Sequence, residues 1–387
     1  MSTVDLLSDY APSGEYHAID LERFSVIESR HQRLGELIRE QGLDGLLLMR
    51  PSNFAWLTVG CDSTRGSWND SVASLFITPE ARVVLSRNTD ATQLFDRSLA
   101  GLGFQLKERV WTEDRQVLMS DICRSRNVAC DQLFENCPDI SPHLAGMRLP
   151  LAPVEMKSLV HAGAVLAHAL EATGRGFNKG ETEAEVAGQI AHRLLRHEAS
   201  PVRIQVWADG KGQRYRHWGY GNAPVERYCT LTAVARLHGL HVGASRTVCF
   251  GQPPKEVRAA HLDSLLVEST GIFFSQRQWK IYETWNRVER IYEKFGHTEE
   301  WHFSDQGCVT GYEFCEAPIV PRSEFRLETG MPLYWHSSIG PALSSDTVLI
   351  TDEGLSIVTR MENWPRVEID VKGVQLSRPD ILIRPEN

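Results

Sequence analysis

The residues most able to do chemistry gather in two polar segments in the second half of the chain. One is WADGKGQRYRHWGYGN, residues 207–222, and the other is HFSDQGCVTGYEFCEAP, residues 302–318. Rings and acids mixed in this way are typical of an aromatic cage for a small cation, and equally of a hydrophobic core with a polar rim. The aromatic residues in or near these segments are Trp207, Tyr215, Trp218, Tyr220, Trp301, Tyr312, Tyr334 and Trp335, and the acids are Glu300, Asp305, Glu313 and Glu316.

Thiols offer a second kind of chemistry. Cys308 and Cys315 lie in the second polar segment, where either would become a nucleophile if a neighbouring group lowered its pKa. Buried cysteines are more often small apolar side chains. Cys123, Cys130 and Cys137 recur every seven residues, but no Cys-x-x-Cys pair or nearby His completes a zinc site. We expect reduced thiols without a disulfide framework.

Other catalytic signatures are weak. ADGKGQR, residues 208–214, looks like a phosphate loop but lacks P-loop spacing and a strand–helix context. No Gly-x-Ser-x-Gly elbow stands out. We interpret ADGKGQR as a turn.

Composition narrows the class of protein. The chain has 387 residues and a formal net charge of −9, with a pI near 5.9. Nucleic-acid and anionic-membrane binders usually present a basic face, so this balance disfavours both. No apolar run approaches a membrane span, and the residues before Phe24 lack a basic region followed by an apolar one. We expect a cytoplasmic protein that acts on a small molecule, with no nucleic-acid or membrane partner.

Helix and strand patterns alternate in the first part of the chain. Residues 26–47 have apolar side chains at helical spacing and run into an apolar strand at 45–49. Further strands are predicted at 72–77 and 127–130, and a helix at 94–101. The prolines of LPLAP, residues 149–153, then break the pattern. We predict an α/β domain over 1–152 and a second domain over 153–387.

The second domain has the pattern of a duplicated α+β unit. Helical spacing covers 154–175, and Thr182 with Glu185 three residues later is a capping box that starts another helix. Strands follow at 202–207, 228–236 and 241–250. A second helix pair, 254–273 and 279–295, precedes a strand-rich remainder from 301 to 383.

Two stretches carry a family resemblance. ARLHGLHVGASRTVCF, residues 235–250, is similar to the middle of the creatinase/prolidase/methionine aminopeptidase family, where an Asp, then Gly-Tyr, then a second Asp precede Thr-Arg-Thr. RLGELIREQGLDGLLLMRPSNFAWLTVG, residues 33–60, looks like the family's opening, a helix, a strand and an Asn-x-x-Trp-Leu-Thr-Gly turn. The resemblance implies an α+β pita-bread domain, a smaller α/β domain before it, and a homodimer.

The resemblance also implies five metal ligands, and every matching position is changed. Thr232 and Gly243 stand where the family has two Asp, and His336 and Ser345 where it has two Glu. Hydroxyl groups and a bare glycine are poor ligands for a hard divalent cation. We therefore expect no bound metal and no other cofactor.

The fifth ligand of the family is a His in the second polar segment. One branch has His-His-Gln-Gly-Gly-x-Thr-Gly-Tyr here, and Ser304 and Asp305 replace the two histidines. A shifted gap would restore one ligand, Asp305 or His302. It would not restore five.

Some members of the family work without metal, and they suggest where chemistry would remain. In creatinase-like proteins the working His lies just before the first Asp strand, which corresponds to His217. The resemblance therefore implies His217 as general base, since imidazole exchanges protons near neutral pH. A structural His that holds a loop is the alternative.

Other site residues follow from the same resemblance. His336 and Tyr312 are candidate catalytic groups, and Arg216, Trp218, Arg246, Gln306, Glu313 and Trp335 are candidate substrate contacts. Each of these residues also has a structural alternative. For Arg246 we favour a salt bridge that holds strands together, and for Gln306 we favour a hydrogen bond to buried backbone groups.

Three functions remain open. The first is a metal-independent hydrolase of the creatinase type, which cuts a C–N bond of a small polar or cationic molecule. The second is a catalytically inactive protein that binds a small molecule or a partner. The third is a Xaa-Pro dipeptidase or aminopeptidase whose ligands are misaligned above.

Overall fold

The structure is a computed structural model that describes residues 20–65 and 71–386. The residues before Asp20, considered above for a leader, lie outside this range. The chain divides into two compact units, Met1–Arg148 and Leu149–Asn387, and each is described by itself. No helix in the described ranges is both long and apolar enough to cross a membrane.

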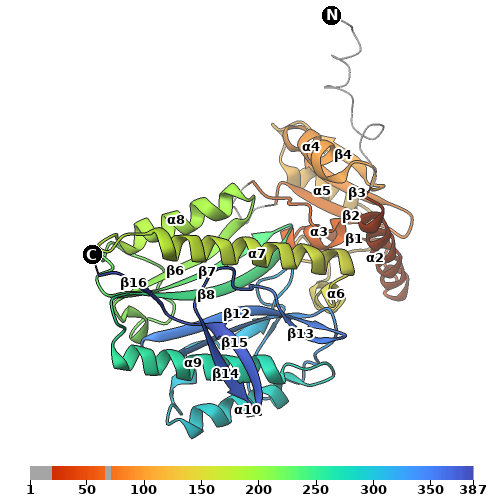
Figure 1. Cartoon of the computed structure of the whole chain (residues 1–387). Coiled ribbons are helices and arrows are strands. Elements are labelled where there is room, and N and C mark those ends of the chain that lie inside the picture. The colour runs from red at the N-terminus through yellow and green to blue at the C-terminus, as the bar shows by residue number, and fades with distance from the viewer. Residues whose placement is uncertain (1–19, 66–70, 387) are drawn as a thin grey trace, which may run out of the picture. The chain divides into compact units, whose positions relative to one another are not determined.

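The N-terminal unit is built on one five-stranded sheet with the order β4-β3-β2-β1-β5, coloured red to yellow in Figure 1. Its strands are β1 (Gly45–Leu48), β2 (Ala73–Ile77), β3 (Arg82–Arg87), β4 (Gln105–Arg109) and β5 (Val128–Cys130). Its helices are α2 (Leu21–Glu40), α3 (Pro51–Thr58), α4 (Asn88–Leu94), α5 (Arg115–Cys123) and α6 (Ser141–Arg148). β1 is buried along its whole length, as expected for a strand covered on both faces.

One local prediction in this unit was wrong, and the bounds of another were misplaced. PSNFAWLTVG was expected to be a turn, but a proline at the first helical position starts α3, and only Val59 and Gly60 turn. Asp131 fixes this helix, because its carboxylate accepts hydrogen bonds from the Asn53 amide at 2.8 Å and from the Met49 N–H at 2.7 Å. The helix predicted over 94–101 is present as the end of α4 followed by a π-helical segment, Phe95–Leu99, so its bounds but not its helical type were misplaced.

The C-terminal unit has the predicted α+β architecture, with a helix pair and a set of strands occurring twice. In the first half α7 (Pro153–Gly176) and α8 (Glu183–Arg196) cover the sheet β16-β8-β7-β6. The strands are β6 (Ser200–Ala208), β7 (Tyr228–Leu237), β8 (Leu240–Phe250) and β16 (Leu382–Arg384). The predicted capping box starts α8: Glu185 N–H donates to Thr182 Oγ1 at 3.2 Å, and Thr182 N–H donates to the Glu185 carboxylate at 2.8 Å.

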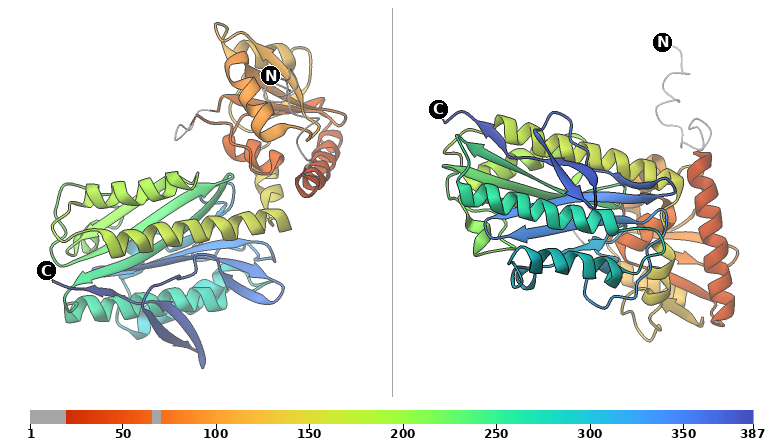
Figure 2. Two further views of the ribbon diagram at one scale, coloured as in Figure 1. Left: turned by 45° about the horizontal axis from the view of Figure 1, so that its top comes forward. Right: turned by 60° about the horizontal axis from the view of Figure 1, so that its bottom comes forward.

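In the second half α9 (Lys255–Phe274) and α10 (Ile281–Lys294) accompany the sheet β10-β9-β11-β12-β13, and α9 lies against β11 and β12. Its strands are β9 (Gly307–Val309), β10 (Ala317–Pro318), β11 (Pro332–Ile339), β12 (Ala342–Thr351) and β13 (Gly354–Ile357). A separate hairpin, β14 (Arg366–Val371) and β15 (Val374–Pro379), packs on α9. Figure 2 shows the two sheets of this unit layered between the helices.

The β7–β8 hairpin positions the central strands of the unit. His238 and Gly239 form its turn with φ of 50° and 78°, the left-handed values that a two-residue hairpin turn requires at both positions. All of β8 is buried, because α7 covers one face of it and β12 lies against the other. The register of β8 therefore decides which of its side chains face β12.

Candidate functional site

The positions matched from the sequence to the family's metal ligands share one face of the C-terminal unit. Thr232 and Gly243 lie on the paired strands β7 and β8, and His336 is the direct cross-strand partner of Ser345 in β11–β12. The two strand pairs are joined where the Gly243 N–H donates to Thr347 Oγ1 at 2.8 Å. We call the surface formed by these five residues the inner face. It is buried throughout.

The inner face has no room for a carboxylate at position 243. A Cβ added to Gly243 would lie 2.4 Å from Cε2 of Tyr334 and 2.7 Å from Cδ2 and Cζ. The Tyr334 ring is fully buried, and its hydroxyl donates to Ser345 Oγ at 3.3 Å. Burial also raises the pKa of Tyr334, so the phenol is neutral. The ring occupies the space into which a longer side chain at Gly243 would project.

Neutral hydroxyl groups complete this face. The Ser345 N–H donates to Ser245 Oγ at 2.8 Å, and Thr230 and Thr247 share a hydrogen bond of 3.2 Å between their hydroxyls. Among the described residues, no group of three or more His, Cys, Asp or Glu side chains is arranged to hold a metal ion. Since divalent metal sites need anionic or imidazole donors, the residues of the inner face do not fit the metals that the family implies.

His336 is the titratable group on the inner face. Burial, and next the charge of Arg203, lower its pKa to about 4, so the imidazole is neutral near pH 7. Its Nδ1 lies 3.4 Å from the backbone oxygen of Asp305. Its Nε2 is buried without a protein partner in the described ranges. A buried nitrogen of this kind needs water or a ligand to complete its hydrogen bonding.

His217 lies at the exposed edge of the same site. Its side chain is 58% exposed, and its Nε2 is 3.5 Å from Oδ1 of Asp305, whose side chain is 50% exposed. Asp305 therefore pairs with His217 through its carboxylate, while its backbone oxygen approaches His336. The structure brings His217 and His336 to the same residue, although they come from different elements.

The loop that carries His217 is fixed from beneath. The Gln205 side chain of β6 donates to the backbone oxygens of Arg216 and Trp218 at 3.3 and 3.1 Å. The Trp207 indole also donates to Trp218 O at 3.1 Å. These bonds hold the backbone on both sides of His217.

The predicted substrate contacts Arg216 and Trp218 have partners within the chain. Arg216 pairs with Glu300 at 2.5 Å and donates to Gly340 O at 2.7 Å. The Trp218 indole donates to Glu183 at 2.9 Å, and the Lys211 ammonium lies 4.7 Å from its ring. A cation of the chain itself therefore takes the face of Trp218 that an aromatic cage would offer.

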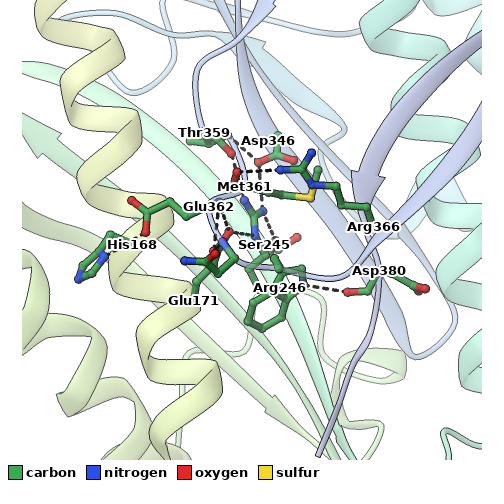
Figure 3. A network of polar contacts seen from close by, with 12 residues as sticks. His168, Glu171, Ser245, Arg246, Asp346, Thr359, Met361, Glu362, Arg366 and Asp380 are labelled. Carbon is green, nitrogen blue, oxygen red and sulfur yellow. Dashed lines mark hydrogen bonds and ion pairs between the residues drawn. The ribbon is translucent and has the colours of Figure 1, made fainter.

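Arg246 holds strands together (Figure 3). Its Nε lies 3.3 Å from Glu171 of α7, and its Nη1 lies 3.2 Å from Asp346 of β12. It also donates to Thr359 O at 3.0 Å. These side chains are buried, and alternation along β8 and β12 directs them away from the inner face. The salt bridge favoured for Arg246 from the sequence is present.

The other predicted residues make contacts of a structural kind. Tyr312 donates to Glu155 at the start of α7. Gln306 donates to Ser304 O at 3.0 Å and accepts from the Tyr292 hydroxyl at 2.6 Å. The structure brings neither Tyr312 nor Gln306 into contact with His217.

Trp335 and Glu313 also lie apart from that pair. The Trp335 indole donates to Ser275 Oγ at 3.0 Å, on the face of β11 that packs against α9. Glu313 is half-buried, and its N–H donates to the Glu316 carboxylate at 3.0 Å. Of the predicted set, His217 and His336 both approach Asp305, and the His336 N–H also donates to Gln306 O at 3.0 Å.

Within each of the two groups of cysteines named above, the side chains lie close together. A hydrogen bond between Cys308 and Cys315 raises the pKa of Cys308 well above its usual value and lowers that of Cys315. Cys123, Cys130 and Cys137 belong to one apolar cluster in the N-terminal unit. Burial raises the pKa of Cys123 and Cys130, so both thiols are protonated.

Sequence reasoning missed Arg203 of β6. Its guanidinium lies 5.2 Å from the centre of the Phe314 ring, and its Nε and Nη2 are buried without a protein partner in the described ranges. The sequence did contain a signal for this residue, because Arg203, Gln205 and Trp207 occupy every second position of a strand and therefore share one face. A positive charge beside His336 disfavours the cationic ligand that the aromatic residues suggested.

Comparisons with known proteins identify the family. The model of metallopeptidase family M24 matches residues 157–356, more than half of the chain. The chain belongs to metallopeptidase family M24. At the coarse level this places it with the peptidase-type hydrolases of that family, and the expected α+β fold with an N-terminal domain is confirmed.

Solved structures resemble this chain in fold over most of its length. The Xaa-Pro dipeptidase from Bacillus anthracis is 16% identical, with a TM-score of 0.74 over 92% of this chain and 100% of that one. The prolidase from Pyrococcus horikoshii OT3 is 16% identical, with a TM-score of 0.75 over 86% and 99%. The N-terminal domain of FACT complex subunit SPT16 from chickpea is 12% identical, with a TM-score of 0.66 over 89% and 98%. No curated protein matches the chain.

Proposed function

We propose that this M24 protein is a metal-independent hydrolase that cuts a C–N bond of a small polar molecule, with His217 as general base. The observation that carries the proposal is the pairing of His217 Nε2 with the Asp305 carboxylate at 3.5 Å. A carboxylate that accepts from one imidazole nitrogen orients the ring and leaves the other nitrogen to accept a proton. The pair lies next to the inner face, where the family places its metals.

The proposed reaction uses only groups of this site and water. Nδ1 of His217 takes a proton from water as the water oxygen bonds to the carbon of the substrate. The C–N bond then breaks, and the protonated imidazole returns its proton to the leaving nitrogen. The neutral His336, through Nε2, and the partner-free nitrogens of Arg203 would donate to the oxygen that gains negative charge.

A substrate panel in the presence of EDTA tests the proposal. The panel holds a guanidino acid (creatine), an N-carbamoyl amino acid and the dipeptide Gly-Pro, and release of amine, urea or ammonia is measured. We expect turnover of the N-carbamoyl amino acid, whose reacting group is neutral and carries a carbonyl oxygen, and its loss in His217→Gln. His161→Gln, an exposed residue of α7, is the matched control and should keep full activity. Turnover of Gly-Pro that EDTA abolishes would contradict the proposal and favour a Xaa-Pro dipeptidase.

A binding protein on the M24 scaffold is the second candidate. Its supporting observation is the inner face, where the Tyr334 ring and a set of hydroxyls take the place of acidic ligands. The likeness to a domain named for a subunit of the FACT complex is consistent with such a use of the fold. A bound compound that copurifies and is not converted, together with no turnover in the panel, would favour this candidate over the hydrolase.

A further inference from the structure

A pocket lies behind β12, away from the inner face. It has a volume of about 540 Å³ and is bordered by the end of β12, by β13, by the segment that follows β13 and by the start of β14. Asp346 lines it, whereas the neighbouring Ser345 belongs to the inner face. Because successive residues of a strand face opposite sides, the pocket is distinct from the His217 site and its role does not depend on the proposed function.

The rim of the pocket carries two arginines whose charge is not neutralised. Arg360 donates from Nε to Ile357 O and from Nη2 to Ser356 Oγ, both at 3.0 Å. Arg366 donates to Met361 O at 3.4 Å, as Figure 3 shows. All these acceptors are neutral, and in the described ranges neither arginine forms an ion pair. Both are exposed, and the neutral acceptors hold their guanidinium groups at the pocket.

The floor of the pocket is rigid, and the negative charge of its carboxylate, Asp346, is already balanced by arginines of the chain. Asp346 accepts from Thr359 Oγ1 at 2.6 Å and from Arg246 at 3.2 Å through Oδ1, and from Arg378 at 2.7 Å through Oδ2. Arg378 also pairs with Glu268 at 2.8 Å, and its Nε is buried without a partner in the described residues. The floor thus presents fixed polar groups, and both carboxylate oxygens of Asp346 accept hydrogen bonds within the chain.

The charges that line the pocket favour an anion. Asp346 and Glu353 contribute two negative charges, and Arg360, Arg366 and Arg378 contribute three positive ones. Asp346 is neutralised by its two guanidinium partners, so Glu353 at the rim is the acid that opposes Arg360 and Arg366. Planar guanidinium groups match the geometry of carboxylate and phosphate oxygens, with which they form paired hydrogen bonds.

We propose that this pocket binds the oxyanion group, a phosphate or a carboxylate, of a small molecule. Arg360 and Arg366 would contact the oxyanion from the rim. Thr359 and Arg378 would shape the floor, where the partner-free Nε of Arg378 offers one further donor. Arg246 and Arg378 both contact Asp346, which connects the floor to β8 and α9.

Calorimetric titration of the full chain with inorganic phosphate, and separately with succinate, tests the proposal. We expect saturable binding of at least one of them, and the tighter anion identifies the source of the oxyanion. Arg360→Gln combined with Arg366→Gln should weaken binding by about tenfold or more, since each lost charged hydrogen bond contributes on that scale. Arg290→Gln, an exposed position on α10, is the matched control and should bind like the unmodified chain.

Both substituted arginines are on the surface, so the variants should fold, and circular dichroism melting verifies this. Saturable binding that is lost in the double variant and kept in Arg290→Gln would support the proposal. No saturable binding of either anion, or equal affinity in the double variant, would overturn it. The His217 assays above do not involve this pocket, so the two proposals fail independently.

Discussion

Gly243 is the position where the structure makes its sharpest prediction about the lost metal site. In Gly243→Ala the new Cβ would lie 2.4 to 2.7 Å from three ring atoms of Tyr334. The ring has little freedom to move away, because it is fully buried and its hydroxyl forms a hydrogen bond with Ser345. The Phe314 ring also packs on it, with 5.9 Å between the ring centres. Overpacking of this kind costs about 1–3 kcal/mol in a buried site.

The contribution of the ring can be isolated with a double-mutant cycle. Tyr334→Ala removes the clash, and alanine in a strand is more stable than glycine by roughly 0.5–1 kcal/mol. Gly243→Ala should therefore be neutral or stabilising in the Tyr334→Ala background, which gives a coupling energy of about 2 kcal/mol or more. Urea unfolding followed by tryptophan fluorescence measures all four proteins.

Gly188 of α8 supplies the matched control. A Cβ there meets no atom within 4 Å, so Gly188→Ala should stabilise the chain by roughly 0.5–1 kcal/mol in both backgrounds. An equal cost of Gly243→Ala with and without the Tyr334 ring would refute the claim that this ring fills the position of the second ligand.

Three further predictions concern charge and metal. Burial lowers the pKa of His241 and of His261 from 6.5 to about 4, so the stability that their neutral forms contribute should be lost as pH falls from 6.5 toward 4. A difference of one unit between the folded and unfolded pKa of a group corresponds to about 1.4 kcal/mol of unfolding free energy. Urea titrations between pH 6.5 and 4 should therefore show a smaller loss of unfolding free energy in His261→Gln than in the unmodified chain. Asp346→Asn should cost about 3–5 kcal/mol, because it removes the buried carboxylate that Arg246 and Arg378 share. Asp352→Asn, in a side chain 79% exposed, should cost less than about 1 kcal/mol; chemical denaturation compares them. Elemental analysis after dialysis against Mn²⁺ or Zn²⁺ should find no stoichiometric metal, and two ions per chain would contradict the expectation that the inner face binds none.

Local patterns were sufficient for much of the fold. The capping box at Thr182 and Glu185, the apolar run of β8 and the repeated order of helix pairs and strands are set by residues close together in the chain. Side-chain periodicity reports such elements directly, because it reflects which face of each element is buried. The turn predicted for PSNFAWLTVG was wrong because a proline at the first helical position and the distant Asp131 favour a helix there.

Residue identity alone was enough for the prediction that Thr232, Gly243, His336 and Ser345 stand at the family's ligand positions and bind no metal, since the type of a side chain shows whether it can bind a cation. What replaced those ligands became visible only in the folded chain. The Tyr334 ring over Gly243 and the pairing of His217 with Asp305 join residues from different strands and loops. Contacts of this kind depend on register and packing between sheets, which no spacing along the chain encodes. The same cause hid the pocket behind β12, whose charges become neighbours only once the strands are assembled.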